Sequence, residues 1–167
     1  MLARGDRVVR SEKVGERGFW LDRVPSAAGN LVYVRRTGTA RIALLGSRLR
    51  CGTPVFYRDR NKMITISGDL GDEDLTLVRR TPFGGRQSPP LPGPKNLGEL
   101  IHMLGDDPQV RSRTDVHGLA LDYSTIARTL NELSLAGAVN AEFMLQTTSV
   151  RDMFGSLSNA GRAESDL

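Results

Sequence analysis

Cysteine, histidine and aromatic residues are scarce in this 167-residue chain, which has one cysteine, two histidines and an aromatic content of 5%. A single cysteine excludes an internal disulfide, and Cys51, beside Gly52 and Pro54, is interpreted as a small buried hydrophobic residue. No apolar run approaches the roughly 18 residues that a membrane-spanning helix needs, so membrane insertion is not expected. The length predicts one folded domain or two small ones.

The motifs of catalysis and of metal or cofactor binding are also missing. His102 lies in a predicted helix and His117 in a predicted loop; a catalytic pair with Cys51 stays open, but no local feature supports it. These residues lack zinc-ligand spacing, and the acidic segment Asp69–Asp74 lacks the register of a calcium loop. Gly84-Gly85-Arg86 lacks the rest of a phosphate-binding loop. The sequence therefore predicts no enzyme, no metal and no cofactor.

Short β-branched and aromatic runs recur at intervals of about ten residues through the first half of the chain. Val8-Val9 and Phe19-Trp20-Leu21 are candidates for additional strands or edges. This pattern predicts a small antiparallel sandwich or barrel. The five expected strands are 31–35, 41–45, 54–57, 63–66 and 75–78.

A proline-rich segment follows, with four prolines among the six residues from Pro89 to Pro94. Proline favours extended backbone and excludes a helix or a central strand. We expect residues 86–95 to form a stiff linker between a basic β-rich domain (1–85) and a smaller module (96–155). A P-x-x-P ligand is the alternative. Residues 156–167, which are small and polar, are predicted to be a disordered tail.

Helical signals begin directly after the prolines. Asn96, followed three residues later by a glutamate, resembles a capping box, and Gly105 can end this first helix. A second helix is predicted to begin near Asp122 and to end at Gly137. Alternating apolar residues in 139–145 predict a half-buried strand. The expected fold class is α+β, with a strand-rich sandwich or barrel-like half followed by a helix–loop–helix–strand unit.

This second unit resembles the C-terminal segment of bacterial flagellar P-ring proteins. The resemblance covers about residues 95–145 and is carried by 96–105, 123–133 and, most specifically, the turn into a strand at Ala136–Phe143. It implies a non-catalytic ring subunit around the flagellar rod, in contact with further copies and with other basal-body proteins. It implies the periplasm if the chain is a fragment of an exported precursor. If Met1 is the true start, the lack of a signal sequence predicts the cytoplasm.

Charge is divided unevenly along the chain. Residues 1–80 carry sixteen lysines and arginines against nine acidic residues, a net charge of +7; residues 81–167 carry seven against ten, a net charge of −3. Opposite charges on two halves can steer head-to-tail contacts between copies, although a solvated, arginine-rich sheet surface is an alternative. Trp20 is interpreted as core, with an interface anchor as the alternative. The candidate interface residues are Trp20, Arg35, Arg36, Arg41, Arg58, Glu132 and Glu142.

Nucleic-acid binding is the alternative function. Arginines that can contact phosphate lie among the predicted strands, close to aromatic residues on which bases can stack. Acidic residues between them dilute the positive field. The residues concerned include Arg35, Arg36, Arg41, Arg58 and Arg60, with Tyr33, Phe56 and Tyr57 nearby.

Overall fold

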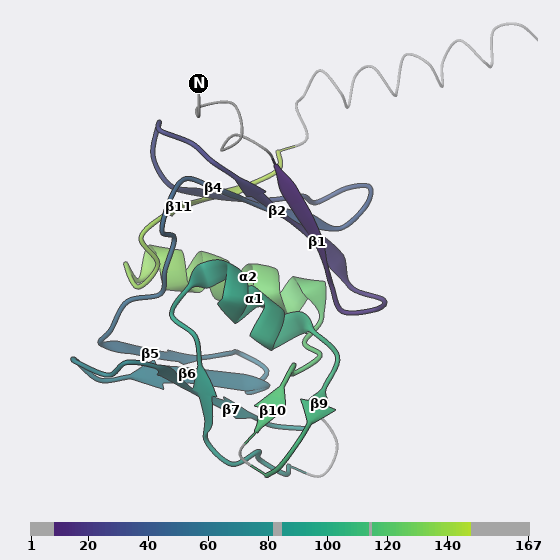
Figure 1. The fold of residues 1–167 in the computed structure, drawn as a ribbon, viewed down its shortest axis with the longest axis vertical. Helices are drawn as coiled ribbons and strands as arrows, with labels where there is room; N and C mark the ends of the chain where they lie inside the picture. Colours follow the sequence, from purple (N-terminus) through teal and green to yellow (C-terminus); the bar gives the residue numbers. More distant parts are fainter. Residues whose placement is uncertain (1–8, 82–84, 114, 148–167) are drawn as a thin grey trace, which may run out of the picture.

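The computed structural model describes residues 9–81, 85–113 and 115–147, which form an α+β fold of two main sheets and two helices (Figure 1). Val8, Gly84 and the expected tail at 156–167 lie outside this part of the chain. The strands are β1 (Arg10–Val14), β2 (Phe19–Val24), β3 (Leu31–Val34), β4 (Arg41–Leu45), β5 (Val55–Arg58), β6 (Ile64–Gly68), β7 (Leu75–Arg79), β8 (Leu91–Gly93), β9 (Gln109–Val110), β10 (Val116–His117) and β11 (Glu142–Leu145). The helices are α1 (Leu97–Gly105) and α2 (Tyr123–Leu135).

A five-stranded sheet contains both the first and the last described strands, in the order β1-β2-β4-β3-β11. The pairs β1–β2 and β3–β4 are antiparallel, whereas β2–β4 and β3–β11 are parallel. Phe143 of β11 lies level with Val32 of β3. The helix–loop–helix–strand unit therefore contributes its strand to a sheet built by the first half of the chain.

A four-stranded antiparallel sheet, β5-β6-β7-β8, includes part of the expected linker. Leu91 and Gly93 of β8 are buried and Pro92 is exposed. A side chain at position 93 would meet Leu77 Cγ at 2.7 Å, so glycine permits the close approach of β7 and β8. Because β8 is an edge strand, the N–H group that Pro92 lacks is not needed for pairing. Residues 91–93 thus belong to a sheet, which differs from the stiff spacer expected over 86–95.

The two helices lie between the two sheets (Figure 1). Tyr123 of α2 donates a hydrogen bond of 2.9 Å to the carbonyl of Arg41 in the five-stranded sheet. Thr129, further along α2, donates to the hydroxyl of Tyr57 in the four-stranded sheet at 3.3 Å. The sheets therefore do not pack directly on each other as in the expected sandwich, since each buries its apolar face against the helices. A single hydrophobic core joins all three layers.

Local expectations from the sequence are confirmed at most element boundaries. The Asn96 side chain accepts a hydrogen bond of 3.1 Å from the Glu99 N–H, and Asp122 caps α2. Gly137, with a φ of +75°, follows the end of α2. The five expected strands correspond to β3, β4, β5, β6 and β7. Neither described helix is long and apolar enough to cross a membrane.

Candidate functional site

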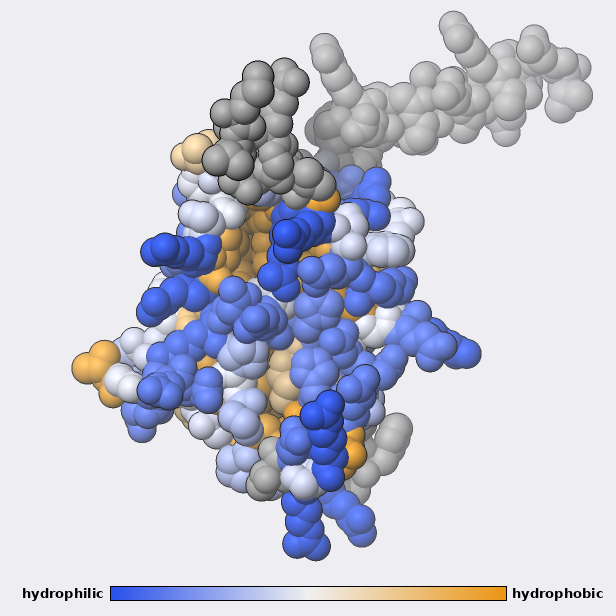
Figure 2. Space-filling view, viewed as in Figure 1, coloured by the Kyte–Doolittle hydropathy of each residue, from blue (hydrophilic) through white to orange (hydrophobic). Residues whose placement is uncertain are grey.

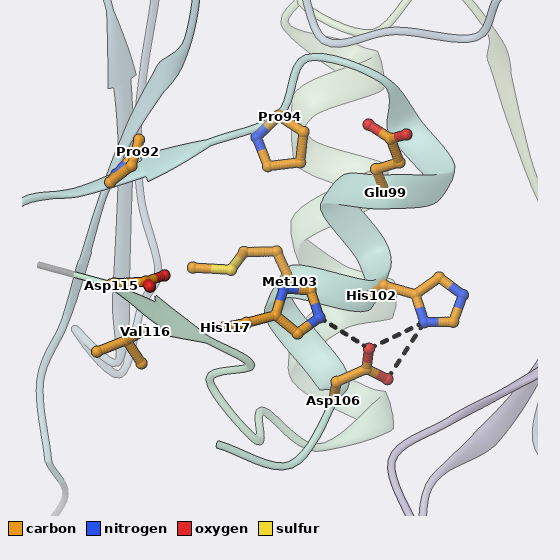
Figure 3. Close-up of a pocket in the computed structure, with 9 residues that line it drawn as sticks. All are labelled: Pro92, Pro94, Glu99, His102, Met103, Asp106, Asp115, Val116 and His117. Atoms are coloured by element: carbon orange, nitrogen blue, oxygen red, sulfur yellow. Dashed lines mark hydrogen bonds and ion pairs between the residues drawn. The ribbon is translucent and has the colours of Figure 1, made fainter. Parts of the chain in front are cut away.

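The two histidines of the chain meet at one carboxylate beside the end of α1 (Figure 3). Nδ1 of His102, in α1, lies 3.1 Å from Oδ2 of Asp106, and Nε2 of His117, in β10, lies 3.2 Å from the same oxygen. The i, i+4 spacing of His102 and Asp106 brings their side chains onto one side of the chain. The i, i+4 spacing makes the His102–Asp106 pair recognisable from the sequence. The approach of His117 cannot be read in this way, because it depends on the β9–β10 hairpin.

A second carboxylate lies on the other side of His102. Its Nε2 atom is 2.7 Å from Oε2 of Glu12 in β1, and Nη2 of Arg23 in β2 is 3.6 Å from the same Glu12 oxygen. Cationic or imidazole groups thus alternate with carboxylates from Arg23 to His117. We call the set Arg23, Glu12, His102, Asp106 and His117 the histidine–carboxylate network. It connects the five-stranded sheet, α1 and β10.

A cavity of about 490 Å³ lies beside the network. The described residues that line it include no serine, threonine, cysteine, lysine or tyrosine, so its reactive groups are carboxylates and imidazoles. His102 has a carboxylate within hydrogen-bond distance of each ring nitrogen, so neither nitrogen is free to act as a general base. The lining residues are Pro92, Pro94, Glu99, His102, Met103, Asp106, Asp115, Val116 and His117.

Cys51 does not line this cavity. The residue is fully buried, and its N–H donates to the carbonyl of Lys95 at 2.8 Å. Burial raises the pKa of the Cys51 thiol to about 11, and the nearby Lys95 ammonium offsets part of this rise. The thiol is therefore neutral at physiological pH, as expected for a small core residue. Among the described residues, no group of three or more His, Cys, Asp and Glu side chains has the arrangement of a metal site.

The candidate interface residues of the five-stranded sheet lie on its outer face or at its ends. Trp20 is half-buried and is not part of the core; its ring lies 5.3 Å from Nζ of Lys13 and 5.8 Å from Cζ of Arg41. Arg41 binds Asp22 at 2.7 Å, so its charge is already paired. Arg35 and Arg36 are exposed where β3 ends.

The remaining candidates lie elsewhere. Arg58 is exposed on β5 of the four-stranded sheet. Glu132, on α2, lies 3.6 Å from Nε of the exposed Arg60 and so forms an ion pair within the chain. Glu142 is exposed on β11. The structure therefore gathers Arg35, Arg36 and Glu142 around the five-stranded sheet and separates Arg58 from them.

The edge formed by β11 is the surface that sequence reasoning missed. Met144 is 51% exposed and Leu145 is 39% exposed, at the outer strand of the five-stranded sheet. The alternating pattern correctly predicted a strand, but its position at an edge depends on pairing with β3. Figure 2 shows a mainly hydrophilic face on which hydrophobic residues are visible at the level of this sheet and the helices below it.

Asn140 fixes the start of β11. Its side-chain oxygen accepts a hydrogen bond of 2.7 Å from the Arg50 N–H, and its side-chain nitrogen donates to the Arg48 carbonyl at 3.0 Å. Asn140 lies in the turn Ala136–Phe143, so this turn is anchored to the loop after β4.

Comparison with known proteins adds no relative, since no family model, curated protein or solved structure matches the chain.

Proposed function

We propose that this chain is a non-catalytic assembly subunit that associates with further copies of itself. The observation that carries the proposal is the edge strand β11, which exposes Met144 and Leu145 at the side of a five-stranded sheet. An open sheet edge with apolar side chains is a template for pairing with another chain, and proteins that stay monomeric usually protect such edges.

The surroundings of β11 support the same function. Leu31, Tyr33 and Leu45 are half-buried on the outer face of the sheet, and Met144 lies level with Tyr33. The exposed residues Arg35 and Glu142 border this apolar strip. An apolar centre with a charged rim is the usual composition of a protein–protein interface.

The histidine–carboxylate network supports a non-catalytic function. Its contacts connect β1, α1 and β10, and the described residues that line the adjoining cavity include no hydroxyl, thiol or amine nucleophile. A set of side chains that are mutually paired in this way serves to hold elements together. Nothing in this proposal requires a cofactor or a metal.

Within this class, a subunit of the flagellar P ring is the specific proposal. Its support is the resemblance over residues 95–145, whose final strand is the same β11 that forms the exposed edge. The partners would then be further copies and other basal-body proteins, and the location would be the periplasm.

Light scattering on a size-exclusion column, at increasing protein concentration, tests the self-association. We expect the unmodified chain to associate, and a variant with Met144→Lys and Leu145→Lys to associate at least tenfold more weakly. The matched control is Leu135→Lys, which changes a leucine that is 79% exposed at the end of α2. A strict monomer at all concentrations, or equal association of the two variants, would contradict the proposal.

Nucleic-acid binding is the second proposal. The observation in its favour is the pair Phe56 and Arg58 on edge strand β5, where Phe56 is 76% exposed and Arg58 is exposed on the same side. A stacking ring beside a phosphate-binding guanidinium suits single strands. The proposal is weaker because Arg35 and Arg36 border the other sheet. Retention of an oligonucleotide that Phe56→Ala does not reduce would indicate nonspecific charge alone.

A further inference from the structure

We infer that copies of this chain join head to tail, with β11 of one copy pairing in parallel with β1 of the next. The five-stranded sheets would then fuse into one continuous sheet. This inference rests on the proposed self-association and specifies its geometry.

The directions of the two edge strands permit this pairing. β1 is antiparallel to β2, β2 is parallel to β4, β4 is antiparallel to β3, and β3 is parallel to β11. β1 and β11 therefore run in the same direction at opposite edges. Among the described residues no strand pairs with the outer side of either one. A neighbouring copy that is shifted sideways past β11, with its strands running in the same directions, therefore places its own β1 parallel to this β11.

The unpaired backbone groups of β11 can be assigned from its hydrogen bonds to β3. The N–H of Glu142 donates to the Asn30 carbonyl at 3.2 Å, and the N–H of Gln146 donates to the Val34 carbonyl at 2.8 Å. Because backbone direction alternates along a strand, Phe143 and Leu145 direct their N–H and C=O groups toward the open edge.

The same argument applies to β1. The N–H of Trp20 donates to the Ala40 carbonyl at 3.0 Å, so the backbone of Trp20 turns away from β1. Lys13 lies level with Trp20 and Ser11 lies level with Asp22. These are consequently the pairs without backbone hydrogen bonds, and Ser11 and Lys13 present their backbone groups to the open edge.

The side chains of β11 and β1 also fit this pairing, because residues that lie level with each other must have their side chains on the same face of the fused sheet. In a parallel strand pair, a residue whose N–H and C=O groups face the other strand lies level with a residue whose N–H and C=O groups face away. The side chains of these two level residues lie on the same face of the sheet. Phe143 packs against the core, and Glu12 lies on the same inner side, where it contacts His102. Placing Phe143 level with Glu12 brings Met144 level with Lys13 on the outer face.

Charge favours this pairing over the two symmetric ones. β1 exposes Arg10 and Lys13, so pairing two β1 strands would bring like charges together. β11 itself carries no basic residue, so pairing two β11 strands places no opposite charge on the facing strand beside Glu142. Only the head-to-tail arrangement places Glu142 beside a basic edge, where its exposed carboxylate can contact Lys13 of the next copy.

Cysteine cross-linking tests the geometry. In a Cys51→Ala background, Lys13→Cys and Met144→Cys are made in separate chains, mixed and treated with a short bis-maleimide. We expect a cross-linked product that contains one chain of each kind, and a ladder of multimers when both changes are in one chain. Cross-linking within a chain is excluded, because β1 and β11 are four inter-strand spacings apart, roughly 19 Å.

A cross-linked dimer of Met144→Cys with itself would show a closed two-fold pairing and overturn the inference. Self-association that survives without any link between positions 13 and 144 would also overturn it, while leaving the assembly function intact. A monomeric protein would overturn both proposals.

Proline substitution tests the backbone pairing itself. Leu145→Pro removes one outward N–H and keeps the ladder to β3, so we expect association at least tenfold weaker with the melting temperature nearly kept. Leu145→Val retains the N–H and serves as the control. Equal association of the two variants, both folded, would exclude pairing at this edge.

Discussion

Asp106 joins three elements through one carboxylate. It accepts a hydrogen bond of 3.1 Å from the Gly15 N–H in the β1–β2 turn and contacts both imidazoles. As the C-terminal cap of α1, it places negative charge where the helix dipole is unfavourable to it. The donors that surround it offset that effect, and His102, in the last turn of α1, supplies a group suited to this end of the helix. The arrangement is therefore that of a structural junction.

Cys51 provides a test at alkaline pH. Because its pKa is higher in the folded protein than in the unfolded chain, folding favours the neutral thiol. This contribution to the free energy of unfolding is complete below pH 9.0 and is lost as pH rises toward 11. Its size corresponds to about 2–3 kcal/mol.

Denaturant titrations of the unmodified protein and Cys51→Ala measure the effect. Other groups, such as tyrosines, titrate in the same range and are common to both proteins, so the difference isolates Cys51. We expect the unmodified protein to lose more stability between neutral pH and pH 11 than the variant does. Parallel pH curves, or rapid reaction of the native thiol with a maleimide near neutral pH, would contradict the buried, neutral state.

At the scale of elements, α1 is held closely from two sides. A Cβ atom at Gly105 would lie 2.6 Å from Cγ1 of Val14 and 3.0 Å from Cδ1 of Ile126. These neighbours belong to β1 and α2, so glycine at this position sets how near α1 approaches both. The seven buried residues among the nine of α1 reflect the same enclosure.

Gly105→Ala is expected to destabilise the protein. Overpacking of this kind costs about 1–3 kcal/mol, and the better helix propensity of alanine returns at most about 1 kcal/mol. Chemical denaturation measures the net loss. The control is Gly52→Ala, where the nearest atom, the Ala138 carbonyl oxygen, is 3.5 Å from the added carbon and little change is expected. A Gly105→Ala variant as stable as the unmodified protein would mean that Val14 and Ile126 can shift at little energetic cost.

At the scale of the whole molecule, the core does not divide at the proline-rich segment. Phe19 and Ile42 from the five-stranded sheet, Ile66 from the four-stranded sheet and Leu100 and Leu130 from the helices belong to one cluster. Neither sheet can bury its inner face without the helices, which come later in the sequence. The charge difference between the two halves therefore lies within one packed unit.

One cooperative unfolding transition is the expected consequence. Trp20 fluorescence reports on the five-stranded sheet, and far-UV circular dichroism reports chiefly on α1 and α2. Thermal melting curves from the two signals should coincide. Two separate midpoints would indicate that residues 1–85 and 96–147 unfold independently.

Local signals predicted local structure well. The caps at Asn96 and Asp122 and the glycine after α2 act within one turn of a helix, so they can be read from neighbouring residues. The pairing of β11 with β3, the strand β8 and the contact of Glu12 with His102 join segments far apart in the sequence. The periodicity of apolar residues along the chain does not indicate such long-range contacts. For the same reason, the network and the exposed edge were beyond sequence reasoning, although Glu142 was identified.

The position of β11 has a consequence for biosynthesis. Residues in contact at this edge, such as Arg36 and Gln146, are 110 positions apart. At typical elongation rates, roughly 5–20 s pass between the synthesis of β3 and the synthesis of its partner strand β11. Pairing over such separations also folds slowly. A nascent chain would carry an open β3 edge throughout that interval, so chaperone protection is most needed before β11 emerges.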